Sequence, residues 1–289
     1  MTIRVFAAVG FLAFLTTFLP AGAETPLERG KYLVESVVAC GNCHSTRGED
    51  GNFVPGMNLA GGFLLEDKMM TAFAPNITPD KETGIGAWTD AQILTAIREG
   101  KHPSGKILGP PMPFAFYRYV SDDDAKAIVA YLRSIKPVRN AVPRARYRIP
   151  LPPAWGPPIN QPVSAPPRSD TIAYGAYLAG PLGHCLDCHT PRLPNGAPDL
   201  ANRAGAGGFH LEGPWGEVVS ANITPDKETG IGTWTDAQIK RAITQGNRAD
   251  GSPLSPPMGF GFYKNINEKD LDAIVAYFRS LRPIKNKVR

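Results

Sequence analysis

The spacing of apolar residues predicts short helices separated by long, turn-rich loops. Apolar side chains recur at helical spacing across residues 89–100, between the Thr89 cap and a terminal glycine. Another helix is expected to begin at the acidic run 121–124 and to end before Pro137, and an earlier one to begin near Pro26. The sequence contains 29 prolines and 30 glycines, so much of the remainder is expected to be loop, with few strands. The predicted fold class is therefore all-α.

The same pattern occurs twice along the chain. Residues 76–86 (NITPDKETGIG) repeat without change at 222–232, and the helices expected in the first half have counterparts near Ile172, across 235–246 and from Asn267. Between the halves, residues 139–168 are dense in proline and arginine, which favours an extended linker. We predict two tandem domains, 24–138 and 169–289, joined by this proline-rich linker.

The N-terminus predicts export from the cytoplasm. An apolar run from Val5 to Leu19 is followed by the small-residue site Ala21-Gly22-Ala23, the pattern of a cleaved signal peptide over residues 1–23. The run is short for a retained membrane anchor, and no later stretch approaches the roughly 20 apolar residues of a spanning helix. A periplasmic protein, soluble or peripherally bound to the inner membrane, is expected.

Composition and charge narrow the partners only slightly. The chain is 43% hydrophobic and 20% charged, as in ordinary globular proteins. Its net charge of +5 favours acidic protein surfaces or anionic lipid headgroups over nucleic acid in this compartment.

All four cysteines occur in two Cys-x-x-Cys-His motifs at equivalent places in the repeat. Residues three apart share one face of a helical turn, so both thiols of a motif can attach to one porphyrin while the following histidine ligates iron. A disulfide within each pair, or a zinc site using both pairs, are the alternatives. A disulfide would not require a histidine next in both copies, and the two pairs are too far apart in sequence for a typical zinc ribbon. The predicted attachment residues and proximal ligands are Cys40, Cys43, His44, Cys185, Cys188 and His189.

A methionine loop in each half supplies the candidate sixth ligand. Met258 is the only methionine after residue 168, and it matches Met112; each follows Pro-Pro in a loop before the last helix. The alternative is a methionine that fills an apolar gap. Trp88 and Trp234 could donate to a haem propionate or pack in the core. Three histidines without counterparts are expected to be surface or packing residues: His102, His184 and His210.

Both halves resemble class I cytochrome c domains, by the motifs above and the Trp-Thr-Asp-Ala-Gln stretch beginning at Trp88 and Trp234. More specifically, they resemble the cytochrome c subunits of bacterial periplasmic alcohol, aldehyde and gluconate dehydrogenases. The resemblance implies two covalent haems, one iron held by His44 and Met112 and the other by His189 and Met258. Those subunits usually carry three haem modules and a membrane-binding segment, whereas this sequence shows two modules, so a soluble or peripheral dihaem carrier is expected.

Two functions fit this sequence. One is electron transfer from a periplasmic dehydrogenase to a cytochrome or oxidase of the respiratory chain, since histidine and methionine would fill both axial positions. The other is a dihaem redox enzyme of the peroxidase or thiosulfate-oxidising type, which needs one displaceable axial ligand. We expect the carrier, with no catalytic residue.

Overall fold

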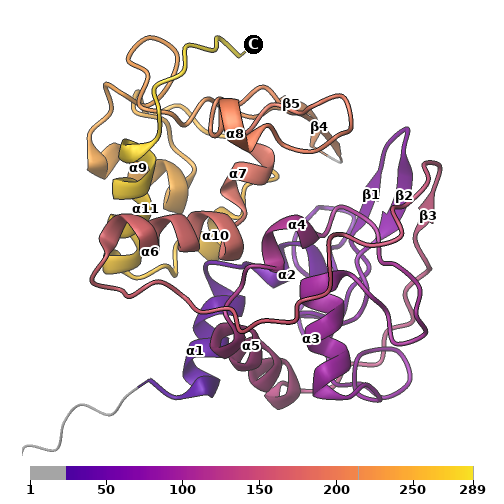
Figure 1. The fold of residues 1–289 in the computed structure, drawn as a ribbon. Coiled ribbons are helices and arrows are strands. Elements are labelled where there is room, and N and C mark those ends of the chain that lie inside the picture. Colours follow the sequence, from indigo (N-terminus) through magenta and orange to yellow (C-terminus); the bar gives the residue numbers. More distant parts are fainter. Residues whose placement is uncertain (1–23, 214, 289) are drawn as a thin grey trace, which may run out of the picture.

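The two halves of the chain repeat one arrangement of crossed helices, as the computed structural model shows for residues 24–213 and 215–288 (Figure 1). Helix α1 (Pro26–Glu35) packs against α5 (Asp122–Ser134) in the first half. Helix α6 (Thr171–Tyr177) packs against α11 (Glu268–Ser280) in the second. The expected signal peptide, residues 1–23, lies outside the described residues.

The predicted helix boundaries are confirmed where capping signals define them. Both α3 (Asp90–Glu99) and α9 (Asp236–Gln245) begin after a threonine that forms a capping box, and both end at a glycine in the left-handed region, with φ of 63° and 69°. The remaining helices are α2 (Cys40–His44), α4 (Phe114–Tyr117), the π-helix η1 (Leu178–Leu182), α7 (Cys185–Cys188), α8 (Leu200–Arg203) and α10 (Phe260–Tyr263).

The expected all-α fold of two tandem domains and a separate linker is wrong, because the described residues include two antiparallel sheets. Strand β2 (Met70–Phe73) pairs with β1 (Leu64–Glu66) on one side and with β3 (Arg146–Tyr147), contributed by the linker, on the other. Strands of two to four residues are too short for an alternating pattern to be recognised in sequence. The strands are β1 (Leu64–Glu66), β2 (Met70–Phe73), β3 (Arg146–Tyr147), β4 (His210–Gly213) and β5 (Gly216–Val219).

A glycine sits where the first and last helices cross in each half. A Cβ added at Gly30 would lie 1.9 Å from the carbonyl oxygen of Ala127, and one added at Gly175 would lie 1.9 Å from that of Ala273. Because no side chain fits at this distance, the two helix backbones can meet only through glycine. The repeat therefore preserves the same crossing twice.

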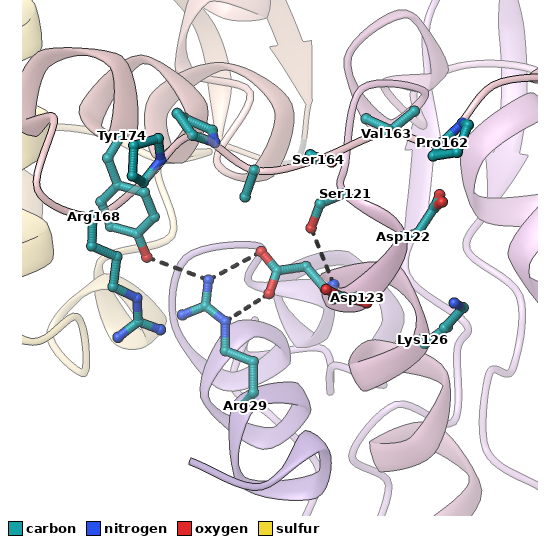
Figure 2. A pocket seen from close by; sticks show the side chains of 14 residues that line it. Arg29, Ser121, Asp122, Asp123, Lys126, Pro162, Val163, Ser164, Arg168 and Tyr174 are labelled. Atoms are coloured by element: carbon teal, nitrogen blue, oxygen red, sulfur yellow. Dashed lines mark hydrogen bonds and ion pairs between the residues drawn. The ribbon is translucent and has the colours of Figure 1, made fainter. Parts of the chain in front are cut away.

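Two reciprocal hydrogen bonds join the halves. The Tyr177 hydroxyl donates to Asp124 Oδ2 at 2.7 Å, and the equivalent Tyr32 hydroxyl donates to Asp270 Oδ2 at 2.8 Å. Each tyrosine thus crosses from the first helix of one half to the start of the last helix of the other. Arg29 adds an ion pair to Asp124, with Nε 2.7 Å from Oδ1, and points toward Tyr174 of the second half (Figure 2).

The linker passes over the same region of the interface. The amide of Asp122, the first residue of α5, donates to the Val163 carbonyl at 2.8 Å. Together with Arg29 and Tyr174, the linker lines an open pocket of about 530 Å³ (Figure 2). The linker is therefore packed against the folded halves along much of its length.

Candidate functional site

The first Cys-x-x-Cys-His motif forms a short helix of its own. Helix α2 spans Cys40–His44 and follows Ala39, whose φ of 52° is left-handed. His44 is buried, and its Nδ1 lies 2.8 Å from the Pro75 carbonyl oxygen. Burial lowers the pKa of His44, which the hydrogen bond to Pro75 partly opposes. A neutral ring that donates from Nδ1 leaves the Nε2 lone pair for a metal.

The second motif repeats this geometry. Helix α7 spans Cys185–Cys188 and follows His184, whose φ is 40°. His189 Nδ1 lies 2.7 Å from the carbonyl oxygen of Ala221, the counterpart of Pro75, and burial lowers the pKa of this histidine too. Both histidines are thus fixed through one nitrogen to a backbone carbonyl of the repeated loop.

The donor set fits a covalently attached haem. All four cysteines are free thiols, so each motif offers two sulfurs for thioether bonds beside an oriented imidazole. Within residues 24–213 and 215–288, no group of three or more His, Cys, Asp and Glu side chains is arranged to hold a metal ion without such a cofactor. A buried Nε of Arg47, three residues after His44, has no partner in that part of the chain and could donate to a carboxylate.

The two candidate methionines occupy matching loops. Met112 and Met258 are each half-buried, and the carbonyl of each accepts the amide of the second residue after it, at 2.9 and 3.0 Å. These bonds place both methionines directly before a short helix, α4 or α10. The peptide bonds Pro110–Pro111 and Pro256–Pro257 are both cis.

The structure also brings each motif against the other half, which the sequence did not predict. Asn42 Nδ2 donates to the Pro257 carbonyl at 3.0 Å, beside Met258, and a Cβ on Gly41 would lie 2.7 Å from the Phe262 ring. In return, the Tyr117 ring of α4 lies edge-on to His184, with centroids 5.7 Å apart. Both motifs therefore lie at the interface between the halves.

Other residues named from the sequence have packing contacts. His102 Nδ1 lies 2.8 Å from Ser104 Oγ, and His210 Nδ1 lies 2.8 Å from Glu217 Oε1. Trp88 and Trp234 pack against the hydrophobic core. Asn76 Nδ2 donates to the Val138 carbonyl at 2.7 Å, and its counterpart Asn222 makes the same bond to Ile284 at 2.8 Å.

An arginine beside each motif was missed by sequence reasoning. Arg47 lies over the Phe53 ring and Arg192 over the Phe209 ring, each with its guanidinium carbon 4.1 Å from the ring centroid. Both follow the motif histidine by three residues, so the repeat itself was the available signal. These stacked guanidinium groups cover the first loop residues beyond each motif.

Comparison with known proteins gives a family match and several relatives. Residues 27–136 match the sequence model of the family described as cytochrome c. The chain is 32% identical to the fructose dehydrogenase cytochrome subunit of Gluconobacter japonicus, over 97% of this chain and 58% of that protein. It is 29% identical to the gluconate 2-dehydrogenase cytochrome c subunit of Pantoea cypripedii, over 94% of this chain and 63% of that protein.

A further relative is similar over most of its own length. The dihaem cytochrome c-type protein of Cereibacter sphaeroides is 29% identical, over 85% of this chain and 83% of that protein. The chain spans less than two thirds of the two dehydrogenase subunits named above. No helix among residues 24–213 and 215–288 is long and apolar enough to cross a membrane.

Proposed function

The chain carries a cytochrome c domain at residues 27–136 and resembles dehydrogenase cytochrome c subunits over nearly its full length, and from this premise we propose that it is a dihaem electron carrier. A domain of this family binds haem c covalently. The observation that carries the proposal of a second haem is the second motif, whose histidine, His189, is fixed to a backbone carbonyl as His44 is in the first.

The chain's own residues have clear roles in this proposal. Cys40 and Cys43 would attach one haem and Cys185 and Cys188 the other. His44 and His189 would each donate Nε2 to iron, oriented by the hydrogen bond at Nδ1. Met112 and Met258 would each supply a second protein ligand to one of the irons. Haem c supplies an iron that exchanges one electron between the ferrous and ferric states, and two protein ligands would exclude a substrate from that iron.

A dehydrogenase is the proposed electron donor. Two of the relatives are named as cytochrome subunits of a fructose and a gluconate dehydrogenase, which supports a donor of that class. A cytochrome or oxidase is the proposed acceptor, in the periplasm after removal of residues 1–23, with peripheral contact to the membrane. The net charge of +5 suits docking on acidic partner surfaces.

Haem content and absorption of the purified protein test the proposal. Two haems per chain are expected, falling to one in a Cys185→Ser/Cys188→Ser variant, whereas the control change Asp123→Asn, at an exposed residue of α5, should leave two. The ferric protein should show the weak near-infrared band of methionine ligation from both haems. Met258→Ala should keep its haem but bind about one equivalent of carbon monoxide in the ferrous state.

The competing dihaem enzyme predicts a different result. A band that changes when peroxide, cyanide or thiosulfate is added, with turnover of one of them, would show that one axial ligand is displaced in function. That result would replace the carrier with the enzyme. A count of one haem per chain would contradict the assignment of Cys185, Cys188 and His189.

A further inference from the structure

The linker makes two side-chain hydrogen bonds to the methionine loop of the first half. The Tyr147 hydroxyl donates to the Pro110 carbonyl at 2.9 Å, and Trp155 Nε1 donates to the Leu108 carbonyl at 2.7 Å. Both acceptors lie within four residues of Met112 and on its N-terminal side. Because burial raises the pKa of Tyr147, its hydroxyl stays protonated and able to donate at neutral pH.

The same two side chains also cover the loop sterically. A Cβ added at Gly109 would lie 2.3 Å from the Tyr147 ring, so this ring lies directly on the glycine backbone. The Trp155 ring centroid is 5.6 Å from that of Phe114, the first residue of α4 and fully buried. The loop that presents Met112 is therefore held at its centre and beside the helix that follows it.

The linker is itself anchored at both contacts. Tyr147 belongs to β3 and pairs with Met70 of β2. The Trp155 carbonyl accepts a hydrogen bond from Arg118 Nη1 at 2.9 Å, and Arg118 is the residue that ends α4. The linker could thus follow an opening loop only by breaking its own contacts to a sheet and to a helix, so an opening of the loop breaks the two hydrogen bonds.

The second methionine loop differs at the equivalent positions. Ser255 stands where the first half has Gly109, and it is exposed whereas Gly109 is buried. Its Cβ would occupy the place that the Tyr147 ring takes in the first half. In the part of the chain that the structure describes, the carbonyls of Leu254 and Pro256 accept no side-chain hydrogen bond. Among the carbonyls of residues 254–258, only that of Pro257 accepts one, from Asn42.

We propose that the linker braces the first methionine loop. Tyr147 and Trp155 are its positioning residues, and they hold Met112 on the first-half iron more firmly than Met258 is held on the second-half iron. This inference rests on the proposed ligand assignment. Its consequence is that an added ligand displaces the second-half methionine first, so the two sites differ although their motifs match.

Imidazole binding to the ferric protein measures this difference, because imidazole can bind only when the methionine has left. Its apparent association constant is the intrinsic constant multiplied by the fraction of open loop. In a Met258→Ala background the near-infrared band reports Met112 alone. Adding Tyr147→Phe or Trp155→Phe should raise the apparent constant about tenfold each, since each removes one hydrogen bond that only the closed loop makes.

Two controls separate bracing from general destabilisation. Tyr119→Phe makes the same chemical change at an exposed tyrosine of the same half and should alter the constant less than about twofold. In a Met112→Ala background, Tyr147→Phe should leave imidazole binding at the Met258 site unchanged. The Met258 site in the Met112→Ala background should also bind imidazole more tightly than the Met112 site does in the Met258→Ala background, each being read from its near-infrared band.

Each other outcome overturns the inference. If the apparent imidazole constant in the Met258→Ala background is the same with and without Tyr147→Phe or Trp155→Phe, the linker does not hold the loop. A Tyr147→Phe effect of the same size in both backgrounds means that the whole chain has been destabilised. A band unaffected by Met112→Ala refutes the ligand assignment itself, and with it both the proposed function at this site and the brace.

Discussion

Asn42 and Asp187 occupy the same position in the two Cys-x-x-Cys-His motifs but differ in charge. Asn42 donates to the Pro257 carbonyl, whereas Asp187 pairs with Arg192, its Oδ1 2.9 Å from Nη1. Both side chains of this pair are mostly buried, so the charge of Asp187 is offset by Arg192 and only partly screened by water. At the residue scale, this is the clearest electrostatic difference between the proposed haem sites.

Asp187→Asn is expected to raise the reduction potential of the second-half haem. A nearby carboxylate favours the more positive ferric state, and removing it favours the ferrous state by an amount on the order of tens of millivolts, reduced by the Arg192 that remains. Spectroelectrochemical titration of the two haems measures the change. Asp123→Asn removes one charge from an exposed position outside both motifs and should shift neither potential appreciably. A shift shared equally by both haems would contradict this account.

The attachment and ligand residues that we propose rest on the sequence alone, because their chemistry is local and repeated. Cysteine spacing and the following histidine fall within five residues, and the second copy removes ambiguity. The carbonyls that orient His44 and His189 could not be predicted, because Pro75 and Ala221 lie 31 and 32 residues further along the chain. Those partners depend on how the loop folds back over the motif.

At the scale of elements, Gly30 and Gly175 are expected to be necessary for the helix crossings. Gly30→Ala places a Cβ against the Ala127 carbonyl and should lower the free energy of unfolding by about 1–3 kcal/mol, as overpacking does. Gly175→Ala should cost a similar amount. Urea unfolding measures both, with Gly261→Ala as control, because its Cβ meets nothing within 4 Å. A Gly30→Ala protein as stable as the Gly261→Ala protein would refute the close crossing.

Helices were predictable and strands were not, for a physical reason. The ends of α3 carry their own signals, a Thr89 capping box and a left-handed Gly100, which act within a turn of sequence. Strand β3 consists of two residues in a proline-rich segment and forms because β2 offers it an edge. Its partner is far away in sequence, so tertiary contact decides the strand and local pattern does not.

At the scale of the whole molecule, the contact between halves depends on two tyrosines in equivalent places. Tyr177 and Tyr32 each reach across to an aspartate of the other half. This exchange gives the interface an approximate twofold character, which follows from duplication of the chain. Its specific pairing could not be predicted, because both tyrosines lie on helices whose sequence pattern indicates only which face is apolar.

The pairing predicts a loss of stability at alkaline pH. Burial raises the pKa of Tyr177 above its ordinary value of about 10, and the charge of Asp124 raises it further; burial and then Asp270 do the same for Tyr32. Both tyrosines therefore stabilise the fold fully below about pH 10. Above that pH the unfolded chain loses these protons first, so the free energy of unfolding falls by up to about 1.4 kcal/mol per pH unit for each tyrosine.

A Tyr32→Phe/Tyr177→Phe variant should have a shallower decline above pH 10, because it lacks both groups, and should be less stable at pH 7 by about 1–3 kcal/mol for the two lost bonds. Urea unfolding between pH 7 and pH 11 gives both quantities. Tyr119→Phe, at an exposed tyrosine, is the matched control and should follow the parent.

Since the lost bonds join the halves, the double variant should also unfold over a wider urea range. An unchanged slope would mean that these tyrosines ionise equally in the folded and unfolded chain, which would contradict the two hydrogen bonds to Asp124 and Asp270.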